Sequence, residues 1–276
     1  MLTTVIAAAT LSRPLDVDNS SRKLLTTAAK KYAACLSMSG TITNAISDGE
    51  GTIVTTTTFA YVQPSRFMMQ QKQDSEHGGT FRAGSDGKTF TYDPPLEVSE
   101  TERRRAPLSE PVKKFITKKG DFHMMTVPEM YIAASHSFPD ASPVHDLVMG
   151  AGVNVDSWLK NVTSVSSPVK EDLHGVKVTM ISGNYRSIRA TYDGDDAALP
   201  VVTQGSGGIV MPSKVKVRSE SAPAKFYFYF DDQGLVTRFK TVESYVVKKK
   251  SAYLASIWDI KVAINPDIPL SAYKPY

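Results

Sequence analysis

The chain has 276 residues, of which 41% are hydrophobic and 22% are charged. These fractions are typical of globular proteins, and no apolar run approaches the ~20 residues that a membrane-spanning helix needs, so both a disordered chain and a multi-spanning membrane protein are excluded. The net charge of +4 is too small to indicate a nucleic-acid partner, and the single cysteine excludes both an internal disulfide framework and a cysteine-rich zinc site.

The N-terminal segment is similar to the end of a secretory signal. Met1–Thr10 is apolar and ends in small residues, with Ala7 and Ala9 at the small positions before a cleavage point, although the basic n-region is missing. We interpret residues 1–12 as a signal peptide or its remnant, with a frayed N-terminus as the alternative. Residues 18–276 show no break in composition, which predicts a single domain.

An amphipathic helix is predicted next, with Asn19 or Ser20 as its N-cap. Apolar side chains recur at three- to four-residue spacing on one face of this helix: Leu25, Ala28, Tyr32 and Leu36. Cys35 is expected to be a small buried residue and a poor nucleophile, because it lies beside this apolar face.

Most of the remaining sequence predicts β-strands joined by short turns. The expected strands are Thr52–Val62, Arg66–Gln73, Lys88–Tyr92 after a Ser85-Asp86-Gly87 hairpin signal, Val176–Ile181, Tyr185–Tyr192, Lys214–Arg218, Lys225–Phe230, Leu235–Val247 and a strand containing Leu254–Ile264. Residues 193–208 are rich in glycine and small polar residues and predict a mobile loop. Strands connected by short turns pair antiparallel.

Two short helices are predicted in the middle of the chain. Thr126-Val127-Pro128-Glu129 has capping-box spacing, and Ser142-Pro143 places a cap and a proline before Val144–Met149. A sheet with one apolar face needs a cover, and these two helices and the first one are the available covers. The fold class is therefore α+β.

Catalytic patterns are scarce. The chain has no nucleophile elbow and no phosphate-binding loop. The only cluster of histidines and carboxylates is His136, Asp140, His145 and Asp146. It indicates either a metal or acid–base site or solvated loop residues with helix capping, and we favour the second interpretation. We therefore expect a protein that is not an enzyme and that has no cofactor and no metal.

Large apolar side chains are abundant on the predicted strands: Phe59, Tyr61, Phe67, Met68, Met69, Phe90, Tyr92, Phe226, Phe228, Phe230 and Trp258. Such a set either fills a core or lines a cavity for an apolar ligand, and the residues alone do not separate these alternatives. Basic runs occur at Arg103–Arg105, Lys113-Lys114, Lys118-Lys119 and Lys248–Lys250. They would suit either an anionic membrane surface or acidic partner, or a solvated face.

Four motifs in order resemble a known family. Residues 85–94 (SDGKTFTYDP) are similar to a hairpin of the LolA-like outer-membrane lipoprotein carriers, and the preceding Gln63–Phe67 is similar to their strand turn. Gly234–Phe239 with Val242-Glu243 resembles the closing hairpin of the family. Tyr253–Ile264 with Pro269–Pro275 resembles its last strand and proline-containing tail.

The resemblance implies an unclosed antiparallel β-barrel, or half-barrel, whose concave apolar face is covered by helices. It also implies a periplasmic or secreted, monomeric carrier that binds a lipid or the acyl chain of a lipoprotein and takes no nucleic acid. The implied ligand-binding residues of the apolar cavity are Phe59, Tyr61, Phe67, Met69, Phe90, Tyr92, Phe228 and Trp258. The alternative function is an envelope sensor or interaction module of the same fold, in which the basic runs contact a membrane-protein partner.

Overall fold

The computed structural model describes residues 16–17, 19–48, 51–74, 79–92, 113–116, 126–135, 143–150, 161–193, 216–247 and 250–273. The strands in these ranges form one sheet of thirteen strands in the order β1-β8-β10-β11-β12-β13-β2-β3-β4-β5-β6-β7, and β9 pairs with β10 outside this path. The pairings are antiparallel apart from β1 with β8. The order does not close on itself, so the sheet is an open half-barrel.

The elements in chain order are β1 (Asp16–Val17), α1 (Asn19–Ala33), β2 (Ser37–Ser47), β3 (Thr52–Val62), β4 (Arg66–Asp74), β5 (Thr80–Asp86), β6 (Thr89–Tyr92), β7 (Lys113–Ile116), α3 (Val127–Ser135), α4 (Pro143–Met149), β8 (Val162–Val165), β9 (Val169–Leu173), β10 (Val176–Asp193), β11 (Lys216–Phe230), β12 (Val236–Val247), β13 (Lys250–Ile264) and the 3₁₀ helix η1 (Leu270–Ala272). No helix in these described ranges is long and apolar enough to cross a membrane.

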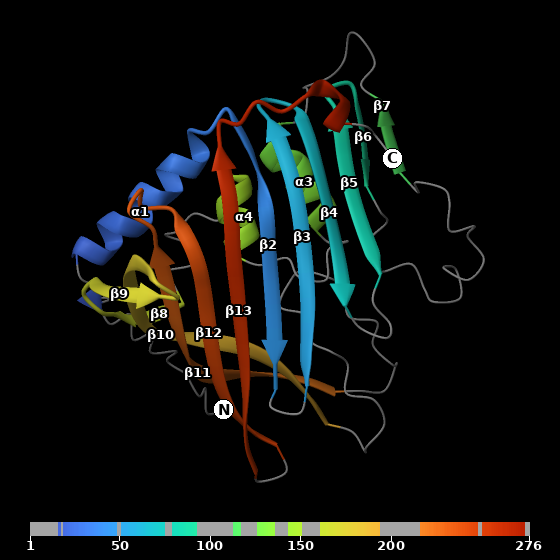
Figure 1. Ribbon diagram of the computed structural model, residues 1–276. Coiled ribbons are helices and arrows are strands. Elements are labelled where there is room, and N and C mark those ends of the chain that lie inside the picture. Colours follow the sequence, from blue (N-terminus) through green and yellow to red (C-terminus); the bar gives the residue numbers. More distant parts are fainter. Residues whose placement is uncertain are drawn as a thin grey trace, which may run out of the picture.

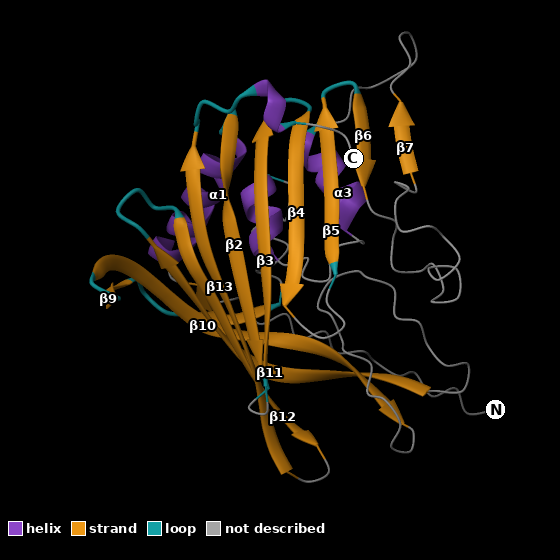
Figure 2. Ribbon diagram, turned by 45° about the vertical axis from the view of Figure 1, so that its right-hand side comes forward, coloured by secondary structure: helices purple, strands orange, loops and turns teal. Residues whose placement is uncertain are grey.

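The helices lie on one face of the sheet. Figure 1 shows α3 and α4 behind the strands β13, β2, β3 and β4, which stand side by side, and α1 at the left of β13. At the lower end, β10 and β11 run across these strands at a steep angle, as Figure 2 shows from a second direction. Cumulative strand twist produces this curvature, and it leaves an inner face that meets the helices and an outer face. The predicted α+β half-barrel with covering helices is confirmed.

Helix α1 buries the predicted stripe only in part. Leu25, Ala28 and Tyr32 are at most 2% exposed, whereas Leu36 is 71% exposed. The helix ends at Ala33, so Leu36 is not on the helical face, and that part of the prediction was wrong. Ser20 was proposed as a cap but lies inside the helix. Cys35 is buried, as expected, and donates its thiol hydrogen to the Lys31 carbonyl (3.1 Å).

The two middle helices are confirmed. The backbone N–H of Thr126 donates to Glu129 Oε2 (2.7 Å) at the start of α3, which is the reciprocal contact of a capping box. Helix α4 begins at Pro143, as the cap-then-proline signal predicted. The buried residues of both helices belong to the same core cluster as the inner face of the sheet.

Two strands are longer than predicted. Residues 176–181 and 185–192 belong to one strand, β10, and residues 216–218 and 225–230 belong to one strand, β11, which begins at Lys216. Gly183 lies within β10, between the two predicted strands, where a Cβ atom would approach the Ser164 carbonyl oxygen to 2.1 Å and a ring carbon of Phe226 to 2.5 Å. A glycine fits there because these neighbouring groups come so close to the backbone.

Several predicted features lie outside the described residues. These are the signal segment 1–12, residues 194–208 of the predicted loop, and the basic residues Arg103–Arg105, Lys118-Lys119 and Lys248-Lys249. The remaining basic residues of those runs begin strands: Lys113-Lys114 begin β7, and Lys250 begins β13.

Candidate functional site

The ligand-binding residues predicted from the sequence lie in the buried layer between the sheet and the helices. Each of the eight side chains is at most 8% exposed: Phe59 and Tyr61 on β3, Phe67 and Met69 on β4, Phe90 and Tyr92 on β6, Phe228 on β11 and Trp258 on β13. All eight belong to one core cluster with the buried side chains of the three helices.

Six of these residues lie on the neighbouring part of the sheet formed by β3, β4 and β6. The rings of Phe59 and Tyr61 stack with their centroids 6.4 Å apart, and those of Phe90 and Tyr92 stack at 5.5 Å. The hydroxyl of Tyr61 donates to the Val148 carbonyl of α4 (3.3 Å). Burial raises the pKa of the Tyr61 phenol, so it remains neutral and acts as a hydrogen-bond donor.

The other two residues belong to a row of aromatic rings across three neighbouring strands. Phe239 of β12 lies between them, with its ring centroid 4.3 Å from that of Phe228 and 5.1 Å from that of Trp258. We call Phe228, Phe239 and Trp258 the aromatic row. Sequence reasoning missed Phe239, because the register shift between Tyr229 and Phe230 conceals which residues of β12 face inward.

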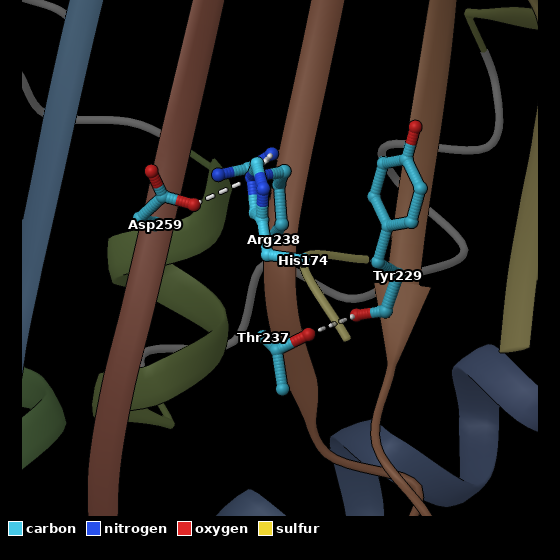
Figure 3. A network of polar contacts seen from close by, with 5 residues as sticks. All are labelled: His174, Tyr229, Thr237, Arg238 and Asp259. Atoms are coloured by element: carbon cyan, nitrogen blue, oxygen red, sulfur yellow. Dashed lines mark hydrogen bonds and ion pairs between the residues drawn. The ribbon is translucent and has the colours of Figure 1, made fainter. Parts of the chain in front are cut away.

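The opposite face of the same three strands is polar. Figure 3 shows Arg238 of β12 bonded to Asp259 of β13, with Arg238 Nε 2.6 Å from the carboxylate oxygen Oδ1. His174 lies beside the guanidinium, with Nε2 3.4 Å from Nη1. Arg238 and Asp259 directly precede and follow aromatic-row residues, so each strand presents an apolar side chain inward and a charged one outward.

Helix α4 meets the sheet through a buried polar cluster. His145 Nε2 lies 3.0 Å from Thr57 Oγ1, and the Gln71 side-chain amide donates to the same oxygen (2.9 Å). The three side chains are fully buried. Burial lowers the pKa of His145 to about 3, so the imidazole is neutral at physiological pH. The interpretation of His145 as a solvated loop residue was therefore wrong, because α4 turns it toward the sheet.

The neighbouring carboxyl is shifted in the opposite direction. Burial raises the pKa of Asp146 to about 6, and a hydrogen bond with the Tyr131 side chain partly opposes this shift. The other two members of the predicted cluster, His136 and Asp140, lie outside the described residues. Within the described ranges, no group of three or more His, Cys, Asp or Glu side chains is arranged to hold a metal ion.

The three helices differ in how they are attached to the rest of the protein. At α1, the Tyr32 hydroxyl donates to the Val236 carbonyl (3.3 Å) and accepts from the Val236 N–H (3.1 Å), while Ser21 Oγ donates to the Ser166 carbonyl (2.6 Å). Helices α3 and α4 have only nine and seven residues. Helices this short have little stability of their own and depend on packing.

One depression lies on the outer face, away from the aromatic side chains. It has a volume of about 400 Å³ and is lined by Thr56, Thr58, Met68, Gln70 and Lys72 of β3 and β4. These residues alternate with the buried Thr57, Phe59, Phe67 and Met69. The depression therefore does not belong to the predicted apolar site.

Comparison with known proteins identifies no family model and no curated protein that matches the chain. Among solved structures, LprF from Mycobacterium bovis is similar over 92% of this chain and 96% of its own, with 9% identity and a TM-score of 0.39. A DUF1329 family protein from Desulfovibrio piger covers 93% and 98% at 9% identity and a TM-score of 0.26. A putative outer membrane lipoprotein-sorting protein domain from Vibrio parahaemolyticus covers 91% and 95% at 9% identity and a TM-score of 0.24.

What agrees with the resemblance found in the sequence is the architecture itself: an open antiparallel sheet with helices on one face. The resemblance to LolA-like proteins is thus confirmed for the fold.

Proposed function

We propose that this chain is an extracytoplasmic, non-catalytic protein that binds the acyl chain of a lipid or lipoprotein between the inner face of the sheet and the helices. The observation that supports the proposal is the collection of the eight predicted side chains in one buried layer under short helices. An acyl chain is apolar, like the helical side chains that this layer already contacts, so it can take their place against the sheet.

Reversible detachment of α3 and α4 would admit the ligand. Both helices are short, and the described polar contacts of α4 with β3 are Tyr61 to Val148 and His145 to Thr57. Helix α1 is held by Tyr32 and Ser21 at two separate places. Because α3 and α4 depend on packing for their stability, they are the elements that open at the lowest free-energy cost. A bound acyl chain then restores the apolar contacts that the helices release.

Tryptophan quenching tests this proposal directly. The chain has two tryptophans, and the substitution Trp158→Phe leaves Trp258 as the only one. We expect a bromine-labelled fatty acid, below its micellar concentration, to quench Trp258 fluorescence, whereas the unlabelled fatty acid does not. Native mass spectrometry of protein purified from a lipid-containing extract should show a bound species of lipid mass.

A matched control places the reporter on the outer face. A variant carrying Trp158→Phe, Trp258→Phe and Tyr229→Trp has its only tryptophan on the opposite side of the same strands. Quenching should be lost in this variant. Equal quenching of both reporters would indicate adsorption to the surface, and absence of quenching together with lipid-free protein would refute the proposed function.

A further inference from the structure

The aromatic row ends at a buried side-chain amide, that of Asn44. Asn44 of β2 is the cross-strand neighbour of Trp258 on one side and of Thr55 on the other. Its side chain is fully buried, and neither Oδ1 nor Nδ2 has a hydrogen-bond partner among the described residues. Buried side-chain amides are nearly always paired, because an unpaired one costs the free energy of its lost hydration.

The surroundings of Asn44 are mixed in polarity. Phe228, Phe239 and Trp258 form a continuous apolar surface that leads across β11, β12 and β13 toward it. Beyond it, Thr55 is 3% exposed, and Ser256, one inward position along β13 from Trp258, is 7% exposed. Along this row of cross-strand neighbours, the inner face thus changes from aromatic to polar at Asn44.

We propose that Asn44 binds the polar end of the ligand, and that this end is a primary amide joined to an acyl chain. This inference rests on the proposed function and specifies its ligand. The Asn44 amide offers two donor hydrogens and one acceptor oxygen. A primary amide complements both, because one of its N–H bonds lies on the same side as its carbonyl: the carbonyl accepts from Nδ2 while that N–H donates to Oδ1. An ester has only acceptors and leaves Oδ1 unpaired.

The acyl chain would then lie along the aromatic row. Both parts of the ligand meet matching surface, because the row is apolar and Asn44 is polar. The free protein is less stable for carrying an unpaired amide, and the bound ligand removes that cost. Selectivity therefore arises mainly from the penalty on ligands that leave the amide unpaired.

Two probes with the same acyl chain test the inference, dodecanamide and methyl dodecanoate, which differ in NH₂ against OCH₃ at the carbonyl carbon. Each is used to displace the brominated fatty acid from the Trp158→Phe protein, with recovery of Trp258 fluorescence as the signal. We expect the amide to bind about tenfold more tightly than the ester, because the ester leaves the buried Asn44 Oδ1 without a donor.

Variants at neighbouring positions separate the two faces. Asn44→Leu should bring the two affinities to within about twofold of each other, because an apolar side chain gains nothing from the N–H. Thr43→Val is the matched control, since Thr43 is the next residue on the same strand and points to the other face. It should keep the wild-type preference. The shift of the amide carbonyl infrared band on binding to wild-type protein, and its absence in Asn44→Leu, is the second measurement.

The outcomes distinguish this inference from the proposed function. If the brominated chain quenches Trp258 but both probes displace it equally from wild-type protein, the Asn44 inference is wrong and the acyl-binding function stands. The same conclusion follows if Asn44→Leu keeps the amide preference. If the brominated chain does not quench at all, the function itself fails. The wild-type comparison alone is decisive should the leucine variant not fold.

Discussion

His145 and Asp146 are adjacent in α4, and acidification changes the free energy of unfolding in opposite directions through these two residues. Burial lowers the pKa of His145 from 6.5 to about 3, so the folded protein binds a proton at this site less readily than the unfolded chain. Burial raises the pKa of Asp146 from 3.8 to about 6, so the folded protein binds that proton more readily. Acidification therefore destabilises the fold through His145 and stabilises it through Asp146.

The magnitudes follow from the two shifts. Between about pH 7.5 and about pH 5, the His145 shift lowers the free energy of unfolding by about 2 kcal/mol. The Asp146 shift alone would raise it by about 1.4 kcal/mol, which we reduce to about 1 kcal/mol because part of the carboxyl faces screening solvent. The two residues together leave a loss of about 1 kcal/mol over this range. Replacing Asp146 by asparagine removes the compensating gain.

Urea denaturation of wild type and Asp146→Asn at the two pH values measures this effect. We expect the variant to lose about 1 kcal/mol more than wild type on acidification, because the difference between the proteins cancels all other titrations. Asp232→Asn, at an exposed carboxyl in the turn between β11 and β12, is the control and should follow wild type. Parallel pH profiles for wild type and Asp146→Asn would refute the buried position of this carboxyl and the reasoning built on it.

Three further substitutions test the packing of the sheet and its helices. Gly183→Ala forces a Cβ atom against a neighbouring aromatic ring and should cost about 2 kcal/mol or more in urea unfolding, whereas Gly51→Ala, with no atom within 4 Å, should be neutral. Glu129→Ala removes the capping contact of α3 and should cost about 1 kcal/mol in the same assay. Cys35 is 4% exposed, so a thiol reagent should modify it only when the helices detach from the sheet. His145→Ala weakens the attachment of α4 and should speed this modification about tenfold, and an unchanged rate would contradict the detachment of α4.

The parts of the fold that could be predicted are those set by local chemistry. The alternation of Phe226, Phe228 and Phe230 with tyrosines fixes the inner face of β11, and the capping residues fix the start of α3. The Asp86-Gly87 turn was predicted for the same reason: Gly87 has φ 92°, and the Asp86 carboxylate accepts from the backbone N–H groups that follow.

The parts that could not be predicted depend on neighbours distant in the sequence. Strand β2 was missed because SMSGTITNAIS has few large apolar residues, and its place is set by pairing with β13 and β3 on either side. Asn44 lies inside that missed strand. His145 is buried because α4 directs it at Thr57, a contact between residues 88 positions apart. The eight side chains predicted to bind the ligand share one buried layer, because strand alternation places them on the inner face.

The pairing of β13 with β2 sets the order in which the protein can be completed. These strands join the two ends of the chain and hold together β2–β7 on one side and β8–β12 on the other. A nascent chain that stops before β13 has two sheets with facing unpaired edges, which favours association with other chains. Contacts so distant in sequence also fold slowly. The surface that joins Trp258 to Asn44 is therefore among the last parts of the inner face to form.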